Sequence, residues 1–203
     1  MSQLRIYDEV HPDAELSLHR DHATIARELD KVGIRFEQWE ASQSIAPGAS
    51  QDEVIAAYKT DIDRLMGETG YQAVDVISLT PDHPERAELR QKFLSEHTHS
   101  EDEVRFFVAG AGQFTLHIGG KIYDVLCESG DLIGVPDGTR HWFDMSESPY
   151  FVAIRFFTNK EGWVANFTGD GIAERFPRMQ PYSPSRGRAP RQAGVTIQAY
   201  AGR

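Results

Sequence analysis

Apolar side chains recur at two different intervals along this chain, and the interval changes near residue 71. In the first part, apolar residues return every third or fourth position over 21–32, and Gly33 follows them. This spacing predicts a helix that ends at the glycine. The alternating run over 34–39 predicts a strand, and the Pro-Gly pair within 42–49 predicts a loop.

A second helix is expected to begin at Ser50. Ser50 and Glu53 have the S-x-x-E spacing of a capping box. The apolar positions behind it form one helical stripe, made of Val54, Ile55, Tyr58, Ile62, Leu65 and Met66. We expect the helix to end at Gly67 and the stripe to face the core.

From residue 71 onward the apolar period is two, which is typical of strands. The expected strands are 71–80, 103–108, 113–118, 121–127, 131–135, 139–144 and 150–157. One short helix is expected over 84–91. Turns are expected at Gly110–Gly112, Gly119–Gly120 and Asp137–Gly138. Many short strands with short gaps predict a mainly β fold, an antiparallel sandwich or barrel with peripheral helices.

Composition limits what the chain does. It has 203 residues with 21 basic and 31 acidic side chains, a net charge of -10. This acidity argues against a nucleic-acid binder or a protein of anionic membrane surfaces. Residues 180–203 differ, because they hold four arginines, three prolines and no acid. We expect one domain over 1–179, with α/β elements at its N-terminal side, and an extended or disordered tail over 180–203.

The expected setting is the cytoplasm. The opening MSQLRIYDEV lacks a basic stretch followed by an apolar one, and no apolar run approaches the ~20 residues of a membrane span. The single cysteine, Cys127, excludes an intrachain disulfide and fits a reducing compartment. We expect a monomer, because no additional hydrophobic seam is evident.

The candidate chemistry lies in E-H-T-H-S-E-D-E-V. His97 and His99 are two residues apart, and Glu103 follows four residues later with the same parity. On an extended segment these side chains point to the same side. His141 lies on a second expected strand, introduced by Pro136 and Gly138, and two hairpin-connected strands can bring it to the same point.

Three imidazoles and one carboxylate suit Fe(II), Ni(II), Mn(II) or Zn(II), whereas calcium and magnesium prefer oxygen ligands. The ligand charges leave a divalent ion at +1, which favours an anionic substrate. The other histidines fit this role less well. His11, His19, His22 and His83 are expected at the surface, and His117 alternates onto the face opposite Phe114, Leu116 and Ile118, which indicates a structural role.

The two half-motifs, H-x-H-x3-E-x6-G and G-x5-P-x-G-x2-H, resemble those of cupin barrels. The stretches KFLSEHTHSEDEVRFFVAGAGQFTLHI, GDLIGVPDGTRHWFDM and FVAIRFFTNKEGWVANFTGDGIAERFP resemble the acireductone dioxygenase family. The likeness covers roughly residues 1 to 177 and leaves out the tail. It implies a cupin-type antiparallel barrel, also called a double-stranded β-helix or jelly roll.

The resemblance also implies a reaction. Members of this family bind one Fe(II) or Ni(II) through residues that correspond to His97, His99, Glu103 and His141. The family's substrate is 1,2-dihydroxy-3-keto-5-methylthiopentene of methionine salvage, which is cleaved with O2. With iron the products are 4-methylthio-2-oxobutanoate and formate. With nickel they are 3-methylthiopropanoate, formate and carbon monoxide.

Further residues are expected around the ligands. Arg105 shares the parity of Glu103 and would offset the charge of a dianionic substrate, and Glu101 shares it as a candidate base. Four more residues are expected to contact the substrate: Phe93, Phe143, Arg155 and Trp163. The alternatives are another cupin oxygenase or decarboxylase that acts on a different chelating anion, and a metal-binding cupin that catalyses no reaction.

Overall fold

A computed structural model describes residues 1–159 and 164–182 of the chain. Its strands are β1 (Gln3–Asp8), β2 (Glu15–His19), β3 (Arg35–Gln38), β4 (Ala73–Leu79), β5 (His97–Thr98), β6 (Glu103–Ile118), β7 (Lys121–Glu128), β8 (Asp131–Val135), β9 (Arg140–Asp144), β10 (Tyr150–Phe157) and β11 (Asn166–Phe167). Its helices are α1 (His22–Asp30), α2 (Gln51–Ala57), α3 (Lys59–Thr69), α4 (Arg86–Leu94) and the short 3-10 helix η1 (Ile172–Arg175).

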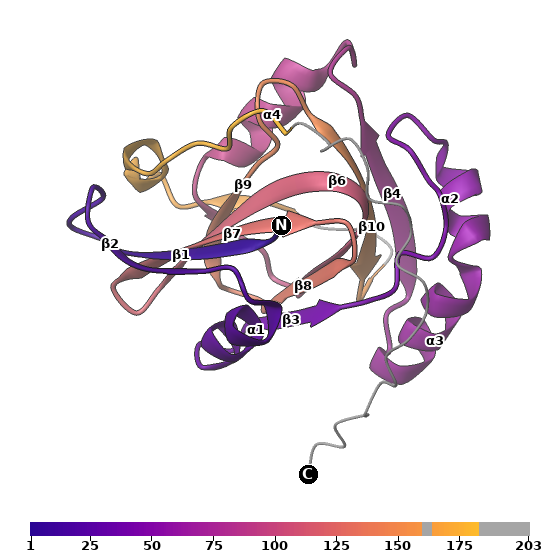
Figure 1. Cartoon of the computed structure of the whole chain (residues 1–203), viewed down its shortest axis with the longest axis horizontal. Coiled ribbons are helices and arrows are strands. Elements are labelled where there is room, and N and C mark those ends of the chain that lie inside the picture. The colour runs from indigo at the N-terminus through magenta and orange to yellow at the C-terminus, as the bar shows by residue number, and fades with distance from the viewer. Residues whose placement is uncertain (160–163, 183–203) are drawn as a thin grey trace.

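The long strand β6 organises the barrel (Figure 1). Its first half pairs with β8 and β10, and its second half pairs with β7 and β9. Strands β3 and β4 extend the first set, and β1, β2, β5 and β11 extend the second. All of these pairs are antiparallel, as expected, and the mainly β class is confirmed.

The expected turn at Gly110–Gly112 is wrong, because the two strands predicted around it are one continuous strand, β6. The glycines instead allow neighbouring atoms to lie close to the backbone of β6. Gly110 has a φ of 69°, and a Cβ there would lie 1.8 Å from the Tyr150 carbonyl oxygen. The pairing of β6 with β10 has a register shift between Phe107 and Ala109, where one extra residue changes the alternation of side chains. Odd-numbered residues such as Arg105 face inward before the shift, and even-numbered residues such as Phe114 face inward after it. The turns at Gly119–Gly120 and Asp137–Gly138 are present.

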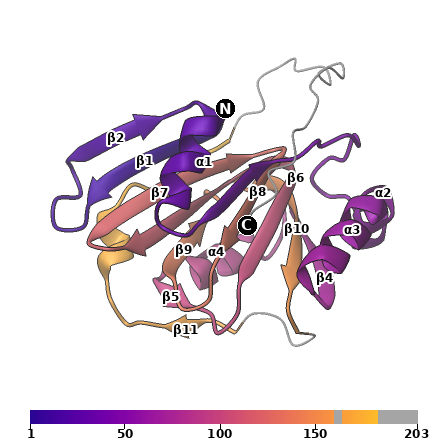
Figure 2. The ribbon, with the colours of Figure 1, turned by 90° about the horizontal axis from the view of Figure 1, so that it is seen from below.

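Two apolar clusters build the core. One fills the barrel and includes Phe107, Phe114, Phe143 and Phe151. The other lies between the outer face of β4, β6 and β10 and the helices α2 and α3, which pack side by side on that face (Figure 2). The helical stripe expected behind Ser50 therefore faces the core, as predicted.

The stripe is divided between two helices, and its expected end at Gly67 is wrong. The capping box of Ser50 and Glu53 is present at the start of α2. The helical path breaks at Tyr58, and α3 runs through Gly67 to Gly70, which takes a left-handed φ of 77°. A helix ends where the backbone turns left-handed, and a glycine within the helical path does not stop it.

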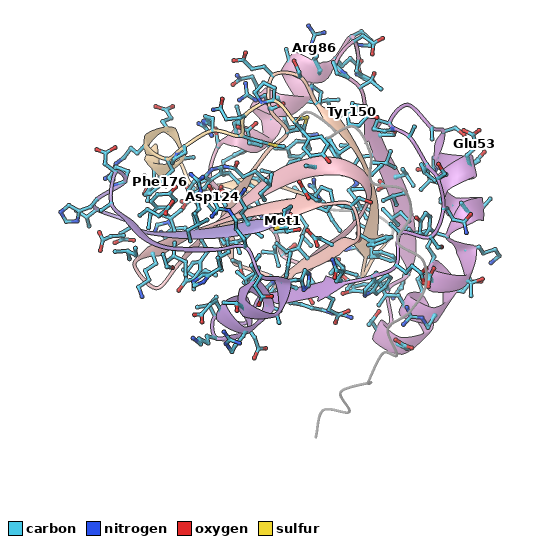
Figure 3. All side chains as sticks on the ribbon, in the orientation of Figure 1. Met1, Glu53, Arg86, Asp124, Tyr150 and Phe176 are labelled. Atoms are coloured by element: carbon cyan, nitrogen blue, oxygen red, sulfur yellow. The ribbon has the colours of Figure 1, made fainter. Side chains whose placement is uncertain are left out.

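Residues at both ends of the described chain add a layer that periodicity did not reveal. The hairpin of β1 and β2 extends the sheet beyond β7. Ile172 and Phe176 of the C-terminal segment pack on Tyr7 of this hairpin and on Trp142 (Phe176 is labelled in Figure 3). In the described part of the chain, no helix is long and apolar enough to cross a membrane. Most of the expected tail, 183–203, lies outside the described residues.

Candidate metal centre

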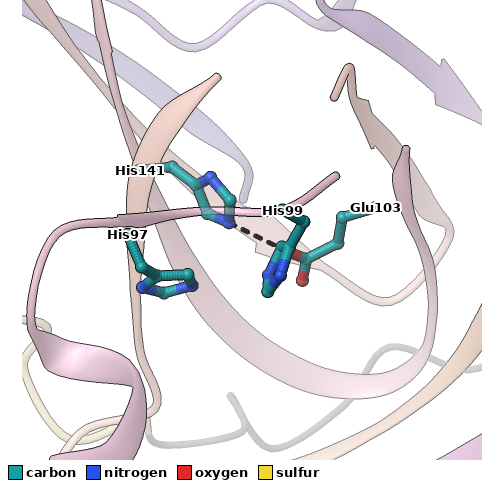
Figure 4. Close-up of side chains that lie close together, drawn as sticks. All are labelled: His97, His99, Glu103 and His141. Atoms are coloured by element: carbon teal, nitrogen blue, oxygen red, sulfur yellow. Dashed lines mark hydrogen bonds and ion pairs between the residues drawn. The ribbon is translucent and has the colours of Figure 1, made fainter. Parts of the chain in front are cut away.

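The four residues expected as ligands converge at one point. One ligand atom from each of His97, His99, Glu103 and His141 lies within 4.8 Å of the other three, and all four residues are buried (Figure 4). Glu103 Oε2 is 2.9 Å from Nε2 of His141 and 3.2 Å from Nε2 of His99.

Strand pairing produces this convergence. His97 lies directly opposite His141 where β5 pairs with β9, and His141 lies opposite Leu116 on β6. Glu103 enters from the other half of β6, where it pairs with Val135. The centre therefore sits where the two halves of the barrel meet, and each half supplies part of it.

Backbone carbonyls orient all three imidazoles. The Nδ1 atoms of His97, His99 and His141 lie 2.8, 2.9 and 2.8 Å from the carbonyl oxygens of Ser95, Val164 and Thr139. A carbonyl only accepts, so Nδ1 carries a hydrogen, and in the neutral imidazole Nε2 has the lone pair that a metal would take. Burial, assisted by His141, lowers the pKa of His97 to about 4, so this imidazole is neutral at pH 7.

Arg105 is the cation next to the ligands. It is buried, and its Nη2 lies 2.6 Å from Oε1 of Glu103. Burial raises the pKa of Glu103, but the charge of Arg105 and the histidine hydrogen bonds outweigh it, so the net pKa lies well below its usual range. Glu103 is thus held as a carboxylate, with one oxygen toward Arg105 and the other toward the histidines.

This donor set fits a transition metal. Three imidazole Nε2 atoms and one ionised carboxylate are donor types that such a metal takes, with each imidazole in its neutral form. The second hydrogen bond on each histidine is the support that metal-binding histidines normally have. With a divalent ion, the ligand set would carry a charge of +1.

The two phenylalanines expected in the site lie against Arg105. Its guanidinium carbon is 4.4 Å from the ring centroid of Phe143 and 5.8 Å from that of Phe93. Phe114, which the sequence analysis did not single out, is 5.1 Å away. Its inward parity is the signal that points to it. Arg105 therefore lies among aromatic faces, which bind a guanidinium favourably.

Arg155 faces the same side of the wall as Arg105, because the two residues are directly opposite in the pairing of β10 and β6. Asp75, opposite it on β4, receives two hydrogen bonds from Arg155, at 2.7 and 2.6 Å. The sequence left the direction of Arg155 open and gave no signal for Asp75.

Glu101 lies beside the end of β10, where Thr158 and Asn159 donate hydrogen bonds to its two carboxylate oxygens. The structure therefore gives Glu101 other partners than the four candidate ligands. Trp163 lies outside the described residues.

The remaining histidines lie outside the four-residue cluster, and His22, which was expected at the surface, stacks on the buried ring of Phe36. His11 is exposed, and His19, His22 and His83 are partly exposed. His117 is buried on the outer face of the barrel wall, with both ring nitrogens against carboxylates.

The barrel and its three-histidine, one-glutamate centre define a metal-binding protein of the cupin class. A model of the ARD/ARD' family matches residues 3–165. The chain belongs to this family, the acireductone dioxygenases, which are metal-dependent oxidoreductases.

Individual relatives agree with this assignment. The chain is 62% identical over 180 residues to the acireductone dioxygenase of Pseudomonas aeruginosa (strain UCBPP-PA14), covering 89% of this chain and 99% of the relative. It is 60% identical over 185 residues to that of Stenotrophomonas maltophilia (strain K279a), covering 91% and 100%. The structure of the acireductone dioxygenase from Bacillus anthracis, with a cadmium ion in its active center, matches with a TM-score of 0.73 and 33% identity, covering 82% of this chain and 98% of that one.

Proposed function

We propose that this chain cleaves the acireductone 1,2-dihydroxy-3-keto-5-methylthiopentene with O2 as a step of methionine salvage. The observation that carries the proposal is the convergence of His97, His99, Glu103 and His141 beside the buried cation Arg105. The names of the relatives in its family add to this support.

These four residues would hold one Fe(II) or Ni(II). The bound ion supplies Lewis acidity, which favours the deprotonated form of a chelating ene-diol. Imidazole and carboxylate ligands suit both metals, so the ligand set itself does not choose between them.

The charge of the site selects for an anion. The ligand set and a divalent ion sum to +1, and an ene-diol dianion brings the total to -1. Arg105 lies 2.6 Å from Glu103 on the same wall and supplies a compensating charge next to the ligands. We assign Arg105, which lies against the rings of Phe93 and Phe143, the role of binding the dianion through its guanidinium.

The proposed products balance without a further cofactor. Keto acid and formate together contain all atoms of the acireductone and of O2. The same holds for 3-methylthiopropanoate, formate and carbon monoxide. We propose the first product set for the iron form and the second for the nickel form, and neither set requires an external reductant.

We propose two further roles. Arg155, fixed by Asp75, would add a second cation at the mouth of the barrel, with Trp163 near the substrate. Glu101, whose carboxylate accepts hydrogen bonds from Thr158 and Asn159, would accept the second proton of the substrate. A Glu101→Gln variant with an unchanged pH–rate profile would remove Glu101 from this role.

The test is O2-dependent loss of acireductone, with products identified, for protein loaded separately with Fe(II) and Ni(II). We expect consumption well above the spontaneous rate, with keto acid from the iron form and carbon monoxide from the nickel form. One product set from both metals would retain the enzyme and reject the metal-dependent outcome. No acceleration in metal-loaded protein, with turnover of oxalate instead, would favour a different cupin activity.

A further inference from the structure

His117 lies at the centre of a second cluster of charged residues, on the outer face of the barrel wall. Its Nδ1 is 2.6 Å from Oε1 of Glu96, and its Nε2 is 2.7 Å from Oε2 of Glu9. His117 and Glu96 are buried, whereas the Glu9 side chain is 37% exposed. We call Glu9, His117 and Glu96 the His117 clamp.

Both ring nitrogens of His117 face carboxylate oxygens. An ionised carboxylate only accepts hydrogen bonds, so both ring nitrogens of His117 must carry hydrogen for both contacts to form. With both carboxylates ionised and both nitrogens carrying hydrogen, the two contacts are charge-assisted, which makes them stronger than neutral hydrogen bonds. A neutral imidazole would leave one carboxylate facing a lone pair.

The clamp is attached to the ligand segment through Glu96, which directly precedes His97. The other oxygen of Glu96 accepts a hydrogen bond from the Thr168 hydroxyl at 2.7 Å, and its carbonyl accepts one from the Thr168 amide at 3.1 Å. Glu96 is therefore held by β6 on one side and by the residue after β11 on the other.

The ligand segment needs such an anchor because its own strand is short. Strand β5 contains only His97 and Thr98, and it pairs with β9 at the single position His97–His141 and with the two-residue strand β11. A strand this short has few backbone hydrogen bonds to fix it. Side chains on its opposite face therefore set its position.

Glu9 connects the clamp to the N-terminal hairpin. It follows β1, and its amide donates a 3.2 Å hydrogen bond to the carbonyl of Gly120 at the turn between β6 and β7. The backbone of Glu9 is thus held at this turn, and its carboxylate lies 2.7 Å from His117. The hairpin, which lies far from the ligands in sequence, supplies one of the two counter-charges.

We propose that His117 is a positioning residue, which holds the segment 96–99 in place through the clamp and thereby slows loss of the metal from the centre. It acts through Glu96 and contacts none of the ligands. The proposal rests on the metal centre and does not require acireductone as the substrate.

The test measures release of Ni(II) from the loaded protein into excess chelator at 25 °C. The variants are His117→Gln, which cannot carry the charge, and Glu9→Gln, which removes the half-exposed counter-charge and spares the core. Glu15→Gln is the matched control, because it makes the same charge change in the same hairpin, in a residue that is also 37% exposed and paired with Arg5. Ile62→Ala in α3 controls for lower stability alone.

We expect His117→Gln to release Ni(II) about tenfold faster, the lower end of the effect known for residues that support metal ligands. Glu9→Gln should give about a threefold increase, and Glu15→Gln and Ile62→Ala should match the unmodified protein. The proposal is overturned if the clamp variants release Ni(II) at the rate of the controls, even where their melting temperatures fall.

A titration with Ni(II) before the release experiment tests the metal centre independently of the clamp. Ni(II) should bind one per chain, and His97→Ala should abolish that binding. If the unmodified protein binds no Ni(II), the clamp's proposed role falls with the metal centre. If it binds Ni(II) and consumes no acireductone, only the proposed reaction falls, and the release experiment still decides the role of His117.

Discussion

The metal centre and the His117 clamp both combine buried histidine with carboxylate, yet they differ in what the imidazole contacts. Each histidine of the centre has one ring nitrogen on a backbone carbonyl and turns the other toward a shared point. His117 has both ring nitrogens on side-chain carboxylates.

This difference separates a candidate ligand from a structural cation. A carbonyl places the hydrogen on Nδ1, so Nε2 of the neutral imidazole has a lone pair that a metal can take. An imidazole held between two ionised carboxylates carries hydrogen on both nitrogens and has no lone pair to donate. The partner of Nδ1, a carbonyl in the centre and a carboxylate at His117, therefore distinguishes these histidines better than their burial does.

The largest expected effect comes from Glu103→Gln, which removes the only ligand carboxylate. Metal affinity should fall by more than the roughly 100-fold seen for supporting residues, and acireductone loss should return to the spontaneous rate. Calorimetric titration with Ni(II) and an O2-uptake assay measure the two effects.

The same variant leaves Arg105 buried without its carboxylate partner. We expect the free energy of unfolding to fall by about 3 to 5 kcal/mol in the metal-free protein, measured by urea denaturation. Glu101→Gln makes the same charge change two residues away and serves as the control. Retained one-to-one Ni(II) binding in Glu103→Gln would contradict the assignment of the centre.

Arg105→Met tests the cation next to the ligands. Its removal should lower kcat/KM by about 10²- to 10³-fold, the usual cost of removing one preorganised electrostatic group. Arg105→Lys should recover only part of the loss, because an ammonium lacks the planar fork that binds Glu103. Steady-state assays that separate kcat from KM check this. A change of less than about threefold would remove Arg105 from dianion binding.

Asp124 supplies a buried carboxyl of a third kind, on the outer face of the wall. Burial raises its pKa to about 7, and its Thr115 hydrogen bond at 3.3 Å offsets this only in part. Between the ordinary pKa of 3.8 and about 7 the folded state binds more protons than the unfolded state. The stability contribution of this group is therefore full below the lower value and is lost as pH rises through the window.

Asp124→Asn should remove that loss. We expect a gain of about 2 kcal/mol at pH 8 and little change at pH 4, below the roughly 4 kcal/mol upper bound set by a shift of about three pKa units. Urea denaturation of both proteins across this range measures the difference. An equal change at both pH values would show that Asp124 is not the titrating group.

The cluster of candidate metal ligands could be predicted from the sequence because its spacing is local. His97, His99 and Glu103 share one parity on a short segment, and His141 follows a recognisable turn. Strand alternation also placed Arg105 and Phe143 correctly. These inferences need only the rule that neighbouring side chains point to opposite faces.

The missed features depend on contacts between distant segments. Asp75 meets Arg155 across 80 positions, and Glu9 meets His117 across 108. The continuous β6 was missed for a related reason, since Gly110 satisfies a close approach to Tyr150 that only the folded chain contains. Periodicity reports which face a residue uses, and it does not report which segment lies opposite.

The smallest expected effect concerns Arg155, which shares the inner wall with Arg105 and is fixed by Asp75. The side chain is 22% exposed, so solvent screens its charge, and its pair with Asp75 adds at most about 1 kcal/mol to stability. Arg155→Met should raise KM for acireductone about fivefold, or about 1 kcal/mol of binding, with kcat nearly unchanged. Arg64→Met on α3, which removes a half-exposed arginine far from the ligands, is the control. An unchanged KM, or a loss of kcat alone, would show that Arg155 has only a structural role in the barrel wall. Arg105 would then be the sole one of these two cations that binds the substrate.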